Sequence, residues 1–435
     1  MNINTQIFAV TGDPVLHSRS PGMFNKVFGK SNINAAYLRL AAKDPSEAVS
    51  VFRSLGMKGM NVTAPFKESI LEYLDEIHKE AEILGCVNTI VDKNGILHGY
   101  NTDPYGVIQS FKDSGISLKG KNCLVIGAGG AGKAAAYGLM KENAIVTMIN
   151  RTNSTAEKAA KRVGCSSKSY DELEEYVRNS EIIISSLSQK INLVKKEWLN
   201  SSQIVLDANY KNSDLNLIAF EKGCKIISAE NWLLNQAIRS YELFLNEKPD
   251  IELMKVGLKN QCLSDRKNKI SLVGLTGAGK TSIGKVLSEK LKCDIKDIDE
   301  SVSQAEKMSI TKIFKMHGEA YFRKLESKEL SKSLCEKNHM VISCGGGIVK
   351  SELNRKQLKE KSLVVWLYVT PETIHSRLDI SDRPFLQADD PLKRLNELFN
   401  ERKGMYAETA HVIFSNEYVK KEIISDKIIK ELKSL

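Results

Sequence analysis

Short apolar runs of strand length alternate with amphipathic helical stretches along the whole chain, and this alternation constrains the fold more than any other feature of the sequence. Five runs follow one another in the middle of the chain: KNCLVIG, IVTMIN, EIIISS, QIVLDAN and KIISA. Three more, KISLVG, HMVISC and LVVWLYV, repeat the theme towards the end. Strands that alternate with helices form parallel sheets covered by helices. The sequence therefore predicts an α/β protein with more than one parallel sheet.

The length of 435 residues suggests two or three domains. The best boundary is the polar and charged stretch 247–268, because a fresh strand begins directly after it. We expect it to be a linker before a last domain over residues 269–435. Residues 1–102 precede a glycine-rich strand–turn–helix unit and are expected to form an α/β domain of their own, followed by a second domain over residues 103–246.

The formal net charge of +10 admits two interpretations. Nucleic-acid binding is one, but the lysines are spread over predicted helical surfaces and do not form a stripe with aromatic side chains, as a nucleic-acid footprint requires. Anionic small substrates suit the same charge. We therefore expect small-molecule substrates and no nucleic-acid partner.

The sequence carries no sign of a membrane span or of export. No apolar run reaches the roughly 18–20 residues that cross a bilayer. The first residues, MNINTQIFAV, lack the basic stretch and apolar core of an export signal. The eight cysteines are scattered without a CxxC pair, which indicates reduced thiols rather than disulfides or a zinc site. We expect a cytoplasmic protein without a membrane partner, for which a monomer is plausible.

A phosphate-binding loop lies near residue 280. Gly274, four further residues, Gly279, Lys280 and Thr281 match G-x-x-x-x-G-K-[ST] between a predicted strand and a predicted helix, which is the context this motif needs. Backbone N–H groups wrap phosphate oxygens, the lysine reaches the β- and γ-phosphates, and the threonine hydroxyl ligates Mg²⁺. The loop residues expected to bind ATP are Gly277, Ala278, Gly279, Lys280, Thr281 and Ser282.

A second glycine loop, near residue 130, contains the same four letters GAGK but fails the same motif, because Ala134 stands where a hydroxyl must hold magnesium. It matches G-x-G-x-x-G, which is typical of dinucleotide sites, so we expect residues 103–246 to form a Rossmann domain whose C-terminal helix returns to the first domain. A turn needed only for strand–helix packing is the alternative. The next strand ends in Asn-Arg-Thr instead of the acidic residue of NAD sites, so we expect NADP(H). The expected cofactor-binding residues are Gly127, Ala128, Gly129, Gly130, Ala131, Asn150, Arg151 and Thr152.

Three polar clusters stand out in residues 1–103. Ser18 and Ser20 lie just before Pro21, with Ser20 expected as a helix N-cap; these hydroxyls and free N–H groups would receive a carboxylate, although a plain capping motif looks the same. In NVTAPFK a strand is expected to end at Thr63, leaving Lys67 at the mouth of the sheet, where a solvated surface lysine is the alternative. GCVNT and GYNTD place Asn88 and Asp103 at further element ends. A lysine held by a carboxylate would protonate an alkoxide formed by hydride transfer.

These motifs, in this order, resemble shikimate dehydrogenase over residues 1–246: HSxSP, NVTxPxK, VNT, NTD, the GAGGAG loop and the NRT triplet. The resemblance implies that Lys67 and Asp103 are the catalytic pair and that NADPH reduces 3-dehydroshikimate to shikimate. It implies a set of substrate-binding residues: Ser18, Ser20, Thr63, Lys67, Asn88, Asp103, Tyr210 and Gln236. The chain departs from the family at Phe24, where histidine is usual, at Ala229 and Asn231, where glycine is usual, and in the run SSLS at 185–188.

The last domain adds polar motifs to its phosphate loop. Asp297 and Asp299 in CDIKDIDE are two residues apart at an expected strand end, so both side chains would point the same way. One would serve magnesium and the other a substrate hydroxyl; an acidic turn without such a role is the alternative. Arg323 and Glu326 face together on a predicted helix, as a surface ion pair also would. CGGGIV after a strand lets a ligand touch backbone, or is a flexible turn. LDISDRPFLQ is a candidate lid over nucleotide.

Together these motifs resemble shikimate kinase over residues 269–435, a P-loop fold similar to nucleoside-monophosphate kinases. The resemblance implies that shikimate is held by Asp299, Arg323, Gly346 and Arg402. It implies that Lys280 and Arg383 stabilise the transferring phosphoryl group, with Asp299 beside them in catalysis, and that Arg377 stacks near adenine. It also implies that Thr281 and Asp297 serve Mg²⁺.

The sequence thus predicts a bifunctional enzyme of aromatic biosynthesis that makes shikimate and then phosphorylates its 3-hydroxyl, with NADP(H), ATP and Mg²⁺. Two alternatives stay open at this point. The dehydrogenase half could act on quinate, against which the NRT triplet and the two serines argue. One half could be a degenerate regulatory module, against which Lys67 and Asp103 argue.

Overall fold

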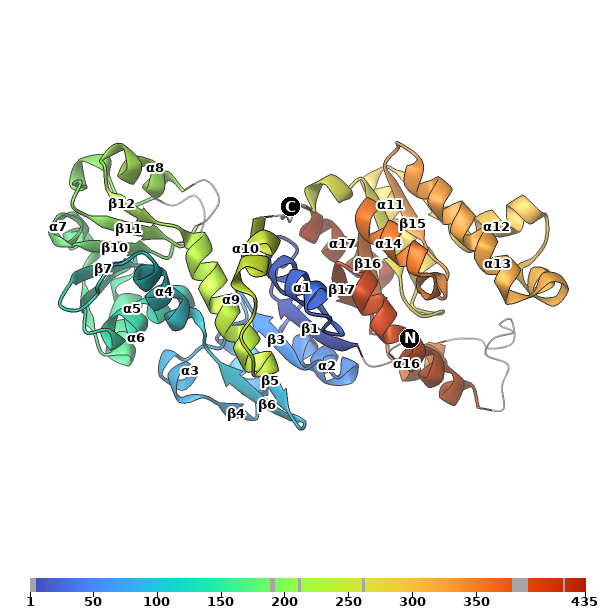
Figure 1. Ribbon diagram of the computed structural model, residues 1–435, viewed down its shortest axis with the longest axis horizontal. Helices are drawn as coiled ribbons and strands as arrows, with labels where there is room; N and C mark the ends of the chain where they lie inside the picture. The colour runs from blue at the N-terminus through green and yellow to red at the C-terminus, as the bar shows by residue number, and fades with distance from the viewer. Residues whose placement is uncertain (1–4, 188–191, 210–212, 260–262, 378–389, 418) are drawn as a thin grey trace. The chain divides into compact units, whose positions relative to one another are not determined.

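The computed structural model describes residues 5–187, 192–209, 213–259, 263–377, 390–417 and 419–435. Its internal contacts divide the chain into two compact units, one of Met1–Phe66 with Val256–Leu435 and the other of Lys67–Lys255. Figure 1 shows strands and helices alternating along the described chain, so the prediction of an α/β protein with parallel sheets is confirmed. The contact division does not follow the enzyme-domain boundaries expected from the sequence, which stay a prediction.

The unit Lys67–Lys255 contains a six-stranded parallel sheet in the order β12-β11-β10-β7-β8-β9. Its strands are β7 (Asn122–Ile126), β8 (Ile145–Ile149), β9 (Ser166–Lys168), β10 (Ile182–Ser185), β11 (Ile204–Asp207) and β12 (Lys225–Ile227). The connecting helices are α5 (Gly130–Lys141), α6 (Asn153–Val163), α7 (Leu173–Asn179) and α8 (Asp214–Glu221). The apolar runs of the sequence are therefore strands covered on both faces, as parallel sheets require.

The same unit holds a smaller group of elements around its other end. These are η1 (Ser69–Tyr73), β4 (Glu76–Ile77), α3 (Lys79–Leu84), β5 (Thr89–Lys93), β6 (Ile96–Tyr100), α4 (Asp103–Asp113) and α9 (Ala229–Leu245). The strands β5 and β6 pair antiparallel. Helices α4 and α9 pack closely together: a Cβ on Gly106 would lie 2.7 Å from the Trp232 ring, so glycine is what allows this approach. The start of α4 is thereby fixed.

The other unit is built on eight parallel strands that run in the order β14-β15-β13-β16-β17-β2-β1-β3. They are β1 (Gln6–Thr11), β2 (Ala35–Leu40), β3 (Gly59–Val62), β13 (Lys269–Val273), β14 (Asp294–Asp297), β15 (Met340–Ser343), β16 (Leu363–Tyr368) and β17 (Val412–Ser415). Strands from both ends of the chain meet where β17 pairs with β2, Val412 opposite Arg39 and Ile413 opposite Leu40. The sequence did not predict this pairing.

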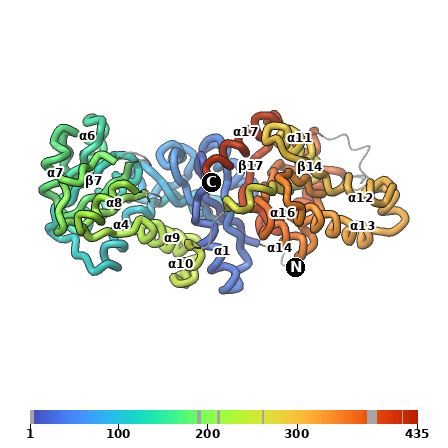
Figure 2. Tube along the Cα trace, turned by 90° about the horizontal axis from the view of Figure 1, so that it is seen from above, coloured from blue at the N-terminus to red at the C-terminus, as the bar shows by residue number. Residues whose placement is uncertain are grey.

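The helices of this unit flank the strands, and α12 and α13 lie side by side in both views (Figure 1, Figure 2). They are α1 (Ser20–Lys30), α2 (Pro45–Leu55), α11 (Lys280–Leu291), α12 (Ile298–Glu306), α13 (Ile310–Cys335), α14 (Glu352–Lys361), α15 (Pro371–Arg377), α16 (Pro391–Thr409) and α17 (Lys421–Leu432). Helix α2 shows how the local sequence sets its bounds: the Asp44 side chain accepts from the Glu47 N–H at 2.8 Å, and Gly56 ends the helix at φ +62°.

Three local expectations need correction. Helix α1 begins at Ser20 with Arg19 as its N-cap, so Ser20 is one residue inside the helix and not its cap. Strand β3 ends at Val62, one residue before Thr63. The segment expected as a linker contains helix α10 (Ile251–Lys259) and the turn η4 (Ser264–Arg266). A Cβ on Gly257 would lie 2.3 Å from the Gly22 carbonyl oxygen, so this segment packs against α1.

Within the described ranges, no helix is long and apolar enough to cross a membrane.

Candidate functional site

Lys67 and Asp103, 36 residues apart in sequence, form an ion pair with Nζ and Oδ2 2.5 Å apart. Asp103 is the first residue of α4, where the helix dipole favours a negative charge. The pair is well shielded, with exposed side-chain fractions of 20% for the lysine and 9% for the aspartate. Burial lowers the pKa of Lys67, but the charge of Asp103 and its hydrogen bond outweigh burial, so the pKa is raised and the ammonium stays protonated at neutral pH.

Asn88 and Gln236, both expected at a substrate site, meet beside this pair. Asn88 Nδ2 donates to Gln236 Oε1 at 3.3 Å and to Thr102 Oγ1 at 3.0 Å. Thr102 N–H donates back to Asn88 Oδ1 at 2.8 Å. Sequence reasoning missed Thr102, although its place directly before Asp103 in the NTD motif was a usable signal. The network fixes the amide groups beside the start of α4.

The glycine loop between β7 and α5 approaches its own backbone very closely. A Cβ on Gly132 would lie 2.0 Å from the Gly127 carbonyl oxygen, and Gly127 itself has φ +105°. Gly129 is different, because a Cβ there would have no protein atom within 4 Å. Open space at a helix N-terminus is where a pyrophosphate can contact backbone N–H groups.

The same loop touches the ion pair's lysine. A Cβ on Gly130 would lie 3.7 Å from Lys67 Cδ, so the proton-carrying side chain runs past the first turn of α5. Lys133, in that turn, is buried and pairs with Glu68 Oε1 at 2.7 Å, so this lysine serves the protein's own packing. The first turn of α5 thus lies beside the side chain of Lys67.

The triplet expected to read the adenosine end of the cofactor lies at the end of β8. Arg151 and Thr152 are exposed, and Asn150 Nδ2 donates to the Thr152 carbonyl at 3.2 Å. Thr152 is the N-cap residue of α6. The Arg151 guanidinium and the α6 N-terminus together form a positive, solvent-facing end to this loop cluster.

Ser18, Ser20 and Thr63 belong to the other unit, and their contacts within that unit are as follows. Ser18 Oγ donates to Ser20 Oγ at 3.4 Å, with Ser18 half-buried and Ser20 buried. A Cβ on Gly12 would lie 2.4 Å from Thr63 Cγ2, so the threonine packs on the strand end that leads to the serines. Phe24, which replaces a usual histidine, is fully buried and stacks on Tyr37 with ring centroids 4.3 Å apart. This departure is therefore part of the core.

The phosphate loop near 280 has the conformation its motif predicts. Gly277 and Gly279 have φ +88° and +85°, and α11 begins at Lys280. Lys280 Nζ donates to the carbonyl oxygens of Gly274 at 2.9 Å and Leu275 at 2.8 Å, which folds the lysine back over the loop. The buried ammonium thus lies inside a turn of backbone dipoles, as needed to meet phosphate oxygens.

Thr281 and Asp297 lie together, as expected of residues that share one cation. Thr281 Oγ1 donates to Asp297 Oδ2 at 2.7 Å and lies 3.2 Å from Ser343 Oγ. Hydroxyl and carboxylate oxygens are donors that Mg²⁺ prefers, and few protein ligands suffice when phosphates supply the rest. The residues therefore fit this ion. Ser343, at the end of β15, was missed by sequence reasoning.

Asp297 and Asp299 do not share a strand face, so that expectation is wrong. Strand β14 ends at Asp297, which caps α12 by accepting from the N–H of Asp299 at 3.1 Å. Asp299 instead lies in the first turn of α12, and a Cβ on Gly345 would lie 2.6 Å from its Oδ1. The strand therefore ends before Asp299, and the two residues lie in different elements.

The three glycines after β15 bring the other kinase-motif residues together. Arg323 pairs with buried Glu326 at 2.8 Å and lies against Gly347, whose Cβ would be 2.2 Å from Arg323 Nη2. Arg402 Nη1 donates to the Gly346 carbonyl at 3.2 Å. A side chain at Gly347 would displace Arg323, one at Gly346 would meet Thr276, and one at Gly345 would meet Asp299 and Glu326, which explains why the turn is all glycine. Two guanidinium groups around one backbone turn suit a carboxylate.

Further groups around this turn were not expected from the sequence. Tyr406 OH donates to the Gly346 carbonyl at 2.6 Å. Glu319 Oε1 accepts from Arg323 Nη2 at 3.1 Å, four residues away, a spacing that could have revealed it. Burial raises the pKa of Glu326 to about 7, although the charge of Arg323 opposes the rise.

Two expected residues, Tyr210 and Arg383, lie outside the described residues. Arg377, at the end of α15, donates from Nη1 to the Asn416 carbonyl at 3.0 Å, and Asn416 Nδ2 donates to the Ala278 carbonyl in the phosphate loop at 3.0 Å. Arg377 is therefore linked to the nucleotide loop through Asn416, a residue that sequence reasoning missed.

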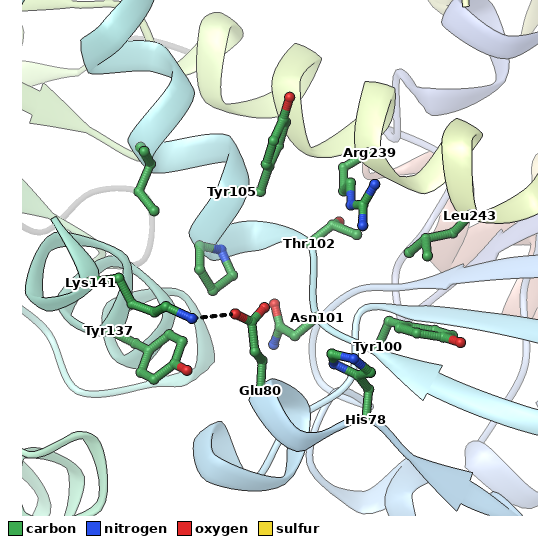
Figure 3. A pocket seen from close by; sticks show the side chains of 12 residues that line it. His78, Glu80, Tyr100, Asn101, Thr102, Tyr105, Tyr137, Lys141, Arg239 and Leu243 are labelled. Atoms are coloured by element: carbon green, nitrogen blue, oxygen red, sulfur yellow. Dashed lines mark hydrogen bonds and ion pairs between the residues drawn. The ribbon is translucent and has the colours of Figure 1, made fainter. Parts of the chain in front are cut away.

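A cavity of about 330 Å³ adjoins the start of α4 without including Lys67 or Asp103 among its lining residues. Figure 3 shows Lys141 reaching Glu80 and His78 lying beside Tyr100. Its two basic side chains are already paired, Lys141 with Glu80 at 3.1 Å and Arg239 with Glu242 at 2.7 Å. These cations are thus engaged by the protein itself, and we assign the cavity no ligand.

Comparison with known proteins matches three family models to the chain. Residues 10–90 match the shikimate dehydrogenase substrate binding domain, residues 109–210 match shikimate / quinate 5-dehydrogenase, and residues 276–433 match shikimate kinase. A shikimate dehydrogenase (NADP(+)) from Pyrococcus abyssi is 37% identical over 256 residues, which cover 58% of this chain and 96% of that protein. One from Pyrococcus furiosus is 38% identical over 262 residues, covering 59% and 96%.

Solved structures give the same picture. The crystal structure of shikimate dehydrogenase from Aquifex aeolicus matches with a TM-score of 0.57 and 32% identity, covering 60% of this chain and all of that one. A shikimate 5-dehydrogenase from Thermus thermophilus, in complex with NADP(H) and shikimate, matches with a TM-score of 0.55 and 29% identity, covering 59% and 99%.

Proposed function

The chain belongs to the shikimate dehydrogenase family and carries a C-terminal shikimate kinase domain, and on this premise we propose that it catalyses two consecutive reactions. The first is the NADPH-dependent reduction of 3-dehydroshikimate to shikimate. The second is the transfer of the γ-phosphoryl group of ATP to the shikimate 3-hydroxyl. The observation that carries the proposal is that both reactive sets are assembled: the Lys67–Asp103 pair beside one glycine loop, and Asp299, Arg323 and Arg402 around Gly345–Gly347 near the other.

In the reduction, NADPH would supply a hydride to the substrate carbonyl carbon when bound. Lys67 donates a proton from Nζ to the carbonyl oxygen as it becomes an alkoxide, and Asp103 holds the ammonium in place. Asn88 and Gln236 are proposed to bind substrate hydroxyls, with Tyr210. The serines Ser18 and Ser20, with Thr63, are proposed to bind the substrate carboxylate side. The raised pKa of Lys67 supports a donor that is charged at neutral pH.

NADP(H) is proposed to lie on the loop Gly127–Ala131. The open space at Gly129 leaves room for its pyrophosphate, and the exposed Arg151 at the start of α6, with Asn150 and Thr152, suits a 2′-phosphate.

In the phosphorylation, Asp299 accepts the proton of the 3-hydroxyl while the hydroxyl oxygen bonds to the γ-phosphorus and the bond to ADP breaks. Arg323 and Arg402 hold the shikimate carboxylate at the glycine turn. Lys280 stabilises charge on the transferring group, and Arg383 is proposed to join it. Mg²⁺, held by Thr281 and Asp297, would neutralise phosphate charge. Arg377 is proposed to lie near adenine.

We place both reactions in the cytosol and propose no nucleic-acid or membrane partner. The described cysteines are all free thiols, which suits a reducing compartment. Both substrates are small anions, in keeping with the basic composition.

The test is a coupled assay on the purified full-length protein. With 3-dehydroshikimate, NADPH and ATP·Mg supplied together, shikimate 3-phosphate should form, and with ATP withheld, shikimate should accumulate. Shikimate and ATP·Mg alone test the kinase by itself. Failure of either half would contradict the proposal and would favour a regulatory role for that half.

Substituting quinate and each nicotinamide cofactor in turn tests the remaining alternative substrate. Faster turnover of quinate with NAD than of shikimate with NADP would overturn the assignment of the first reaction.

A further inference from the structure

Residues 12–19, here called the Ser18 loop, connect β1 to α1 and present Ser18 just before Ser20. Their path is set by buried contacts: Val15 and Leu16 are 0% and 1% exposed, and the Ser18 N–H donates to the Val15 carbonyl at 2.9 Å. The geometry of this loop therefore decides where the serine hydroxyls lie.

The loop is held by a glutamate from the far end of the chain. Glu431, on α17 of the kinase domain, accepts hydrogen bonds from two successive backbone N–H groups. Its Oε2 lies 2.9 Å from the Val15 nitrogen and 2.8 Å from the Leu16 nitrogen. Glu431 is only 3% exposed. Hydrogen bonds from backbone N–H groups to a shielded carboxylate are among the stronger ones in proteins.

A second tie lies at the other end of the loop. Arg39, on β2 and 2% exposed, donates to the Ser18 carbonyl oxygen from Nη2 at 2.5 Å and from Nε at 3.1 Å. Its Nη1 lies 3.4 Å from the carbonyl oxygen of His411, the residue before β17 of the kinase domain. One guanidinium group therefore bridges the Ser18 loop and the kinase domain.

The strand pairing beneath these contacts joins the same two parts. β17 runs parallel to β2, and the Ala41 N–H donates to the Ile413 carbonyl at 3.0 Å. Tyr368, at the end of β16, donates from its hydroxyl to Ser54 Oγ at 2.9 Å. Strand β2 of the N-terminal part and strand β17 of the kinase domain thus cover each other's edges. The Ser18 loop cannot shift without disturbing buried hydrogen bonds.

We propose that the kinase domain completes the dehydrogenase substrate site, with Glu431 as a positioning residue that fixes the Ser18 loop through the N–H groups of Val15 and Leu16. Glu431 acts through the loop and does not touch the substrate. This inference rests on the proposed function, because it assigns Ser18 and Ser20 to substrate binding. It makes the first reaction dependent on residues of the second enzyme.

The test compares Glu431→Gln with Glu422→Gln in the full-length protein. Glutamine keeps the shape of Glu431 but replaces one accepting oxygen with an N–H₂ donor that faces backbone donors. We expect the KM for shikimate in the dehydrogenase assay to rise about tenfold, equivalent to ~1.4 kcal/mol. The dehydrogenase kcat, the KM for NADP and both kinase constants should stay within about twofold, as expected when only substrate binding is lost. Glu422 is exposed on the same helix, so its variant should match the wild type.

The outcomes are separable. Absence of dehydrogenase activity in the wild type would defeat the proposed function itself. An active wild type with an unchanged shikimate KM in Glu431→Gln would overturn the positioning role. A parallel loss of kinase activity in that variant would also overturn it, because it would assign Glu431 to folding of the kinase domain.

A measurement on the wild type needs no variant. In native-state hydrogen exchange, the amides of Val15 and Leu16 should be as well protected as the backbone amides of α17, because one opening event exposes both. If these two amides exchange freely while α17 stays protected, Glu431 does not hold the loop and the proposal fails.

Discussion

Replacing two glycines of the cofactor loop should separate what the fold needs from what the dinucleotide needs. In Gly132→Ala the new Cβ would lie 2.0 Å from the Gly127 carbonyl oxygen, more than an ångström inside an ordinary contact. The carbonyl oxygen belongs to buried backbone and the position of the Cβ is fixed by the backbone of residue 132, so neither can rotate away, and strand β7 and helix α5 must move apart. Overpacking of this kind costs about 1–3 kcal/mol, occasionally more.

The magnitude can be followed by thermal unfolding of the unit Lys67–Lys255. For a body of this size each kcal/mol lowers Tm by about 2–4 °C, so Gly132→Ala should lower the transition of that unit by ~2–12 °C. Its NADPH affinity should fall as well, because the loop is displaced.

Gly129→Ala is the matched control. Its backbone has φ −76°, which any residue adopts, and a Cβ there would have no protein atom within 4 Å. Stability should therefore stay within about 0.5 kcal/mol of the wild type. Because the pyrophosphate is proposed to lie against this backbone, the Kd for NADPH, measured by fluorescence titration, should still rise at least about tenfold. A wild-type Tm for Gly132→Ala, or wild-type NADPH affinity for Gly129→Ala, would refute the reasoning; kinase activity should be unchanged in both.

Three further predictions follow from single side chains. Lys67→Ala should slow NADPH oxidation by about 10²–10⁴-fold and leave ATP-dependent phosphorylation intact, since it removes the proton donor; near-normal oxidation would mean another group donates. Thr281→Ala should lower the phosphorylation rate and shift its Mg²⁺ dependence to higher concentration, whereas Thr281→Ser should retain activity. An equal loss of activity in both variants would exclude the hydroxyl as a metal ligand. Burial and the nearby charges of Lys359, Arg266 and Arg39 hold the pKa of His411 well below its ordinary 6.5. Below pH 6.5 the imidazole of His411 therefore binds a proton in the unfolded chain but not in the folded chain. The free energy of unfolding should fall as the pH falls below 6.5, by at most about 1.4 kcal/mol per pH unit. His411→Asn should flatten this pH dependence in thermal melts, and an unchanged slope would contradict the assignment.

The strands were predictable because a strand buried on both faces must be apolar throughout. The run LVVWLYV is an example: every residue of β16 is buried. The residues alone placed Lys67 and Asp103 at the ends of separate elements, and the resemblance to shikimate dehydrogenase implied that they act as a pair. Arg323 and Glu326 were found by helical spacing alone.

Contacts set by tertiary packing were not predictable. Asp297 and Asp299 were placed on one strand face, yet Asp297 ends the strand by capping α12, and local hydrogen bonding of an aspartate to the following N–H groups outweighed the alternation. Glu431 lies more than 400 residues from Val15 in the chain, and no periodicity relates them. An acidic residue on an amphipathic helix is usually solvated, so its burial is visible only in the structure.

The two GAGK strings show why identical tetrapeptides need not bind the same ligand. At 130–133 the helix begins at the first letter, so the lysine is a full turn inside α5 and its ammonium turns to Glu68. At 277–280 the helix begins at the last letter, so two glycines with positive φ curl the chain first and the lysine folds back over that curl. The difference is a three-residue shift of the helix start along the same string. A hydroxyl at position 134 should therefore not create a triphosphate site, because Lys133 already pairs with Glu68. Ala134→Ser should leave the first loop without measurable ATP binding. ATP binding there would show that the residue types of the motif, and not the position at which the helix begins, decide the ligand.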